Sequence, residues 1–198
     1  MADSPGNYNS TEDNVEFLNR TYNYGPATFD RRQLFVSTYT YRMPFLRSHH
    51  GLVGGALAGW ELSGIMRFQT GAYLTPTGSA TGVTRRSSYD GQPVTVSDPA
   101  PNKWFNTAAF TNAPVAALGN AGVGVIEGPD WFQCDVSLRK VFRIREGWTL
   151  KFQADAFNLP NHTNFDNPNV STSGGSSDGT ISSAEPPRNL QFGVRLAF

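Results

Sequence analysis

Apolar and polar residues alternate with a period of two along several stretches of the chain. Successive side chains of a strand point to opposite faces of its sheet, so this alternation predicts strands with one apolar and one polar face. The C-terminal stretch shows it most clearly, because Leu190, Phe192 and Val194 alternate with Gln191 and Arg195. The pattern predicts long strands over residues 33–45, 58–70, 131–144, 148–157 and 189–198. No segment shows a helical period of useful length.

The polar faces of these predicted strands carry charges of both signs. Burying unpaired charges in a packed core is costly, so a water-filled interior accounts for them better. Lys151 and Asp155 share one face, which predicts an ion network across neighbouring strands and not a catalytic pair of carboxylates. Lys140 interrupts the apolar face of its strand. The charges expected to face the lumen are Arg67, Asp135, Arg139, Lys151, Asp155 and Arg195.

The connections between the predicted strands alternate in length. Short links follow the strands 33–45 and 131–144, whereas residues 71–130 and 158–188 form long loops. Short periplasmic turns, long extracellular loops and strands of about 9–11 residues or more are typical of bacterial outer-membrane barrels. Aromatic residues near both ends of the strands fit the girdles at the two membrane surfaces. The alternative is a soluble β-sandwich with ordinary amphipathic strands.

Composition excludes several other classes of protein. The 198 residues contain 16 Lys and Arg and 16 Asp and Glu, so no basic excess indicates nucleic-acid binding. The single cysteine, Cys134, excludes an intrachain disulfide or a cysteine metal cluster. No apolar run is long enough for a transmembrane helix.

A series of short motifs follows the strand pattern through residues 24–198. In chain order they are FDRRQLFVSTYTYRMPF (29–45), GWELSGIMRFQTGAYLTP (59–76), WFNTAAF (104–110), GNAGVGVIEGP (119–129), DVSLRKVF (135–142), LKFQADAFNLPNHTNF (150–165) and PPRNLQFGVRLAF (186–198). Together they resemble the C-terminal end of the barrel in TonB-dependent receptor-like outer-membrane proteins, and the Oar-like branch most closely.

This resemblance implies an all-β fold, an antiparallel meander of about five long strands that forms the C-terminal part of a barrel of about 22 strands. Residues 1–32 would be part of an extracellular loop and residues 33–198 the C-terminal strands and loops. The barrel-assembly machinery would read the C-terminal pattern of Val194, Leu196 and Phe198. The implied location is the bacterial outer membrane.

The same resemblance implies the partners of the chain. They are outer-membrane lipid, the barrel strands and plug that this fragment lacks, and, only through that plug, the energy-coupling TonB complex. Five strands would leave two unpaired edges, which need other strands. The short connections would then lie in the periplasm and the long loops outside.

The loops suggest a binding role and no catalysis. Aromatic loop residues suit contact with a carbohydrate or peptide solute, although they could equally pack the loops on each other. A soluble β-sandwich that binds carbohydrate is the alternative function. No cofactor, metal site or enzyme is expected: His49 and His50 have no acidic neighbour, His162 suits a structural role, and a G-x-S-x-G match at 175–179 lies in a Ser/Gly-rich loop. The proposed solute contacts are Tyr73, Tyr89, Trp104 and Phe105.

Overall fold

The computed structural model describes residues 21–44, 52–80, 83–115 and 117–198. The chain divides into two compact units. The sheet unit comprises Leu34–Phe68, Phe132–Thr163 and Pro186–Phe198. The loop unit comprises Met1–Gln33, Gln69–Trp131 and Asn164–Glu185. His49 and His50 lie outside the described residues.

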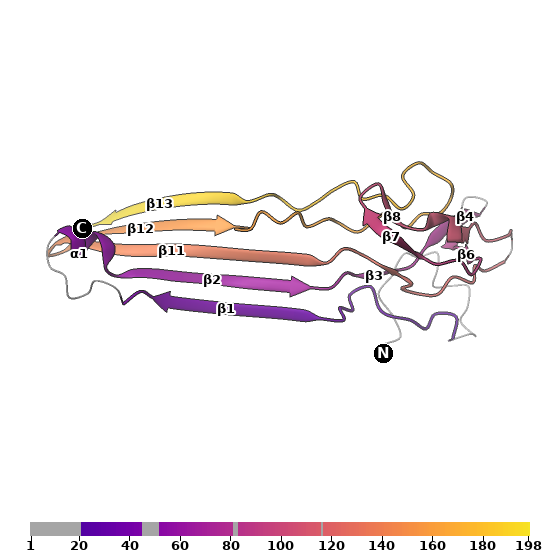
Figure 1. Cartoon of the computed structure of the whole chain (residues 1–198), viewed down its shortest axis with the longest axis horizontal. Coiled ribbons are helices and arrows are strands. Elements are labelled where there is room, and N and C mark those ends of the chain that lie inside the picture. The colour runs from indigo at the N-terminus through magenta and orange to yellow at the C-terminus, as the bar shows by residue number, and fades with distance from the viewer. Residues whose placement is uncertain (1–20, 45–51, 81–82, 116) are drawn as a thin grey trace. The chain divides into compact units, whose positions relative to one another are not determined.

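The sheet unit contains one five-stranded sheet in the order β1-β2-β11-β12-β13 (Figure 1). The sheet is open, with β1 and β13 as its edges. This architecture confirms the predicted all-β antiparallel fold, while a closed barrel of about 22 strands is not seen in one chain. The strands are β1 (Leu34–Arg42), β2 (Trp60–Gln69), β11 (Trp131–Arg145), β12 (Trp148–Phe157) and β13 (Asn189–Ala197).

The register of the last three strands keeps apolar residues beside apolar residues. Phe152 of β12 lies opposite Val194 of β13, and its neighbour Lys151 lies opposite Arg195. On the other side, Phe152 lies opposite Lys140 of β11. A slip of one residue would mix the two faces, so this register is the one that the alternation demands. One face of the sheet is therefore apolar and the other polar.

The connections of the sheet unit include a helix that the sequence pattern did not predict. Helix α1 (Leu52–Leu57) precedes β2. It is too short to produce a recognisable helical period. The connection between β11 and β12 is shorter and forms a tight turn. Gly147 in this turn has a φ of 79°, a conformation that favours glycine.

The loop unit is built from short paired strands where the sequence predicted long loops. These strands surround a core of Phe105, Ala109, Phe110, Ala121 and Ile126. No helix in the described part of the chain is both long and apolar enough to cross a membrane. The pairs are β3 (Tyr73–Leu74) with β10 (Ile126–Glu127), β4 (Thr77–Ala80) with β5 (Val83–Arg86), β6 (Ser88–Tyr89) with β9 (Phe110–Thr111), and β7 (Thr95–Ala100) with β8 (Lys103–Phe105), with a 3-10 turn η1 at Thr107–Ala109.

Candidate functional site

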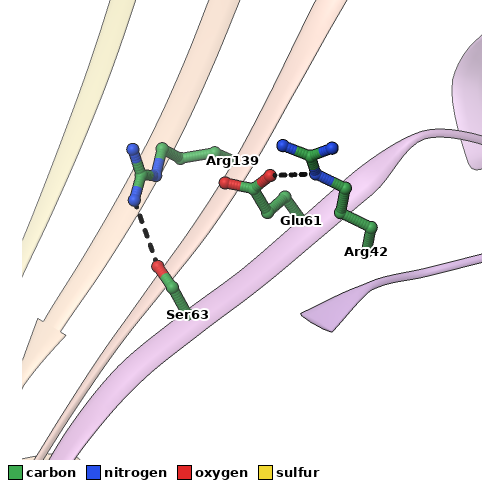
Figure 2. A network of polar contacts seen from close by, with 4 residues as sticks. All are labelled: Arg42, Glu61, Ser63 and Arg139. Atoms are coloured by element: carbon green, nitrogen blue, oxygen red, sulfur yellow. Dashed lines mark hydrogen bonds and ion pairs between the residues drawn. The ribbon is translucent and has the colours of Figure 1, made fainter. Parts of the chain in front are cut away.

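Cross-strand polar contacts tie β1, β2 and β11 together on the polar face of the sheet (Figure 2). Arg42 Nε of β1 donates to Glu61 Oε2 of β2 over 2.9 Å. Arg139 Nη2 of β11 donates to Ser63 Oγ of β2 over 3.1 Å. Alternation had placed Arg42 and Glu61 on the polar face, but their pairing depends on the register between strands, which one strand's pattern does not contain.

Two carboxylates of the polar face are held by glutamines of their own strands. Gln133 Nε2 donates to both oxygens of Asp135, at 2.9 and 2.8 Å. Gln153 Nε2 does the same for Asp155, at 3.0 and 2.7 Å. The backbone N–H of Asn158 also donates to Asp135 Oδ1 over 2.8 Å. Neutral donors therefore bind both carboxylates.

Gln153 lies between Lys151 and Asp155 on their common face and donates to the Asp155 carboxylate, while the ion network expected across neighbouring strands stays a prediction. Lys151 instead lies directly opposite Arg195, and like charges at such positions repel. Both residues line a groove that β12 and β13 form together with Gly193. Asp135, Arg139 and Arg67 occupy the central strands β11 and β2. Asp155 lines the same groove, so charges of both signs occur along this part of β12 and β13.

The C-terminal residues continue the apolar face. Leu196 lies opposite Leu150, and Val194 lies opposite Phe152. The ring of Phe198 stacks on Trp148, with centroids 5.3 Å apart. Phe198 remains 88% exposed, so its ring stays accessible at the end of the strand.

The four aromatic residues proposed for solute contact differ in exposure within the loop unit. Tyr73 and Tyr89 are half-buried. Trp104 is also half-buried, and its Nε1 donates to the carbonyl of Glu127 over 2.8 Å. Phe105 is only 2% exposed and packs edge-on against Phe110. This burial removes Phe105 from the surface that a solute could reach, and leaves the other three partly accessible.

His162 has the local structural setting that the sequence suggested. The side chain of Asn158 accepts from the N–H of His162 and donates to its carbonyl, at 3.0 and 2.8 Å. The His162 ring packs edge-on against Phe132. Asn158 has a φ of 52°, which asparagine tolerates better than most residues. No cluster of three or more potential metal ligands occurs among the residues that the structure describes.

The comparison with protein families decides the class. The family model described as an outer membrane beta barrel domain matches residues 1–191. The chain belongs to this outer membrane β-barrel family. Its location is therefore the bacterial outer membrane, as the family resemblance implied. No curated protein and no solved structure shows significant similarity to the chain.

Membership of the barrel family assigns the two faces of the sheet. Outer-membrane barrels turn an apolar band toward lipid and a polar surface toward the interior. On this pattern we expect the face of Phe152, Phe192 and Val194 to be the lipid-facing face and the face of Glu61, Arg139 and Lys151 to be the lumen-facing face, and the two names are used in that sense below. On the lumen-facing face the charged and amide groups offer hydrogen bonds and charge to whatever fills the barrel.

Proposed function

We propose that this outer membrane β-barrel chain forms the C-terminal part of the wall of a large TonB-dependent receptor-like barrel. The complete barrel takes up a solute, and energy reaches it through a plug that contacts the TonB complex. The chain contributes wall and binding surface and no catalytic group. The motifs that resemble the Oar-like branch support this assignment within the wider family.

The observation that carries the proposal is the open, two-faced sheet. The lipid-facing side of β13 is bare, with Phe192 72% and Val194 67% exposed, while charged residues occupy the opposite face. Both edge strands have unpaired backbone groups, which calls for further strands beside β1 and β13. A soluble sandwich would have packed Phe192 and Val194 on a second sheet. The soluble carbohydrate-binding alternative is accordingly not favoured.

The loop unit supplies the solute-contacting surface in this proposal. Two of its three segments, Gln69–Trp131 and Asn164–Glu185, follow β2 and β12, two strands that run in the same direction from the short-connection end of the sheet. In the proposed orientation both segments emerge outside the cell. Tyr89 and Trp104 pack against the core of the loop unit, and together with the partly exposed Tyr73 they offer aromatic surface to a carbohydrate or peptide.

The test captures the strand that lies beside β13 in cells. A photo-crosslinking amino acid replaces Gln191, an exposed residue of this edge strand. The proposal predicts a crosslink to a strand of a plug-bearing barrel polypeptide, identified by mass spectrometry. The matched control is Leu150, which lies between Phe142 and Leu196 within the sheet and should crosslink only inside the chain.

Two other results would overturn the proposal. A crosslink from position 191 to a second copy of this chain means a barrel assembled from identical subunits. A chain that stays soluble and gives no crosslink means an independent module. Orientation is tested by labelling Asp98→Cys and Glu146→Cys with an impermeant maleimide in a Cys134→Ser background. Only position 98, in the loop unit, should react in intact cells.

A further inference from the structure

Residues 56–58, which lead from α1 into β2, bind to the lipid-facing face of the sheet. The ammonium of Lys140 on β11 donates to the carbonyls of Ala56 and Ala58, at 2.7 and 2.5 Å. The indole Nε1 of Trp60 donates to the same Ala56 carbonyl over 3.1 Å. Lys140 and Trp60 both belong to the apolar face, so the C-terminal end of α1 lies over this face.

The burial of Lys140 explains why the connection is held there. The residue lies opposite Phe152 and is only 3% exposed. A bare ammonium at an apolar position of a membrane protein carries a large cost. Here it lies at the carbonyl end of a helix, where cations are favoured. The rings of Phe142 and Trp60 lie 4.7 and 5.3 Å from Nζ, at distances for cation–π attraction.

The helix has a defined end at this point. Gly59 has a φ of 79°, the left-handed conformation that commonly terminates helices. The N–H of Ala58 donates to the carbonyl of Gly54 over 2.9 Å, which completes the last turn. The Ala56 and Ala58 carbonyls are then left without helical partners and are available to Lys140 and Trp60.

The end of the sheet at which α1 lies has the chemistry of a membrane interface (Figure 1). Trp60 packs edge-on against Phe152, and Trp148 stacks on Phe198. The guanidinium of Arg145 lies 4.5 Å from the Trp148 ring. Tryptophan and basic residues together mark the headgroup level of bilayers, where arginine meets lipid phosphates. Within α1, Leu57 is 53% exposed, and the segment LVGGALAGW contains no charge.

We propose that residues 52–58 form an in-plane membrane anchor, held against the outside of the barrel wall by Lys140 and embedded among lipid headgroups by Leu57. Its partner is the lipid surface, not a periplasmic protein. An uncharged helix end bound to a lipid-facing sheet face has lipid as its natural surroundings. The inference rests on the proposed function only for its assignment to the periplasmic leaflet.

The test measures the depth of position 57 in a bilayer. The full chain, purified together with the strands that pair with it, carries Leu57→Cys in a Cys134→Ser background and a bimane fluorophore. It is reconstituted in vesicles of phosphatidylethanolamine and phosphatidylglycerol with nitroxide on the headgroup or in the middle of the acyl chain. We expect quenching by the headgroup nitroxide and protection from aqueous iodide. Quenching by iodide alone overturns the anchor.

Two further labels separate this inference from the barrel assignment. Phe192→Cys, in the middle of β13 on the lipid-facing face, should be quenched by the acyl-chain nitroxide. Quenching at 192 without quenching at 57 rejects the anchor and keeps the barrel wall. Absence of lipid quenching at both positions rejects the barrel wall itself.

The role of Lys140 is tested with two variants of the Leu57→Cys chain. Lys140→Met keeps the length and apolar packing of the side chain but loses both bonds to the helix. Headgroup quenching at 57 should fall about twofold or more, because the released helix samples other positions. Trp60→Phe loses one bond and keeps an aromatic ring, so it provides a milder variant if Lys140→Met does not assemble. If headgroup quenching at position 57 is unchanged in the variant that assembles, Lys140 and Trp60 do not hold α1 in place.

Discussion

The two units of this chain bury their apolar residues in opposite ways. In the loop unit, Phe105 and Ile126 are each 2% exposed and join a common core. In the sheet unit, Phe192 and Val194 are 72% and 67% exposed although they belong to regular paired strands. The loop unit therefore carries its own hydrophobic core, whereas the sheet unit leaves apolar side chains of a regular strand exposed, and in our proposal lipid covers them.

The two units also differ in how their backbone groups are hydrogen-bonded. Side chains of the loop unit cap nearby backbone groups: Asn120 Oδ1 accepts from the N–H of Tyr89, and Asp178 Oδ2 accepts from Gly174 and Gly175. These bonds stabilise two-residue strands and turns that have few ladder bonds of their own. The sheet unit instead satisfies its backbone through long ladders, which is the form that a bilayer requires.

The largest expected effect comes from removing the core of the loop unit. Phe105→Ala should lower the stability of that unit by about 3–5 kcal/mol, because it deletes a buried ring and leaves a cavity. Urea titration followed by hydrogen exchange of residues 69–131 measures the change. Val115→Ala is the control, since Val115 is 71% exposed in the same unit. Equal effects of the two substitutions would mean that the loop unit has no independent core.

The next largest effect is expected in the sheet unit, from a charge placed on its lipid-facing face. Phe192→Arg should cost about 2–4 kcal/mol of folding into a bilayer, since it places a charge at the lipid-facing midpoint of β13. Its matched control is Gln191→Arg, one residue away on the lumen-facing face, which should be tolerated. Folding yield into lipid vesicles, read by gel mobility of unheated samples, gives both values. A greater loss for Gln191→Arg would reverse the assigned faces.

A smaller effect distinguishes glycines in the two units. A Cβ at Gly71 would lie 1.9 Å from the carbonyl oxygen of Gly128, so Gly71→Ala forces two backbone segments of the loop unit apart. Overpacking of this kind typically costs about 1–3 kcal/mol. Gly193 in β13 has nothing within 4 Å of such a Cβ, and Gly193→Ala should leave folding unchanged or slightly improved. Thermal unfolding of each variant measures the change in stability. A loss of stability in Gly193→Ala as large as that in Gly71→Ala would show that a neighbour packs across β13.

The long strands could be predicted because their signal is local. Residues 148–157 alternate without interruption, and β12 has the same bounds. The loop unit could not be predicted in this way. Its strand β10 has two residues, Ile126 and Glu127, whose partners Leu74 and Tyr73 lie far away in the chain. Two residues cannot display a period, and nothing in either segment specifies the other.

For the functional surfaces too, local features could be predicted and contacts between distant segments could not. Alternation placed Arg139, Lys151 and Arg195 on one face, but it suggested an ion network where the register sets Lys151 against Arg195. It also marked Lys140 only as a break in an apolar pattern. The carbonyls that accept from the Lys140 ammonium belong to a distant segment of the chain. The alternation pattern therefore could not show why a lysine interrupts the apolar face.

The sequence by itself determined the strands and the two-faced sheet, because side chains of a strand alternate through local backbone geometry alone. The outer-membrane class followed from the motifs that carry the family resemblance, since alternation alone also allowed a soluble sandwich. The tertiary structure decided which polar groups meet, that residues between β2 and β11 build a core, and that α1 lies on the lipid-facing face. These features depend on contacts between segments distant in the chain. Such contacts are set by the packing free energy of the whole unit, which no local pattern of residues contains.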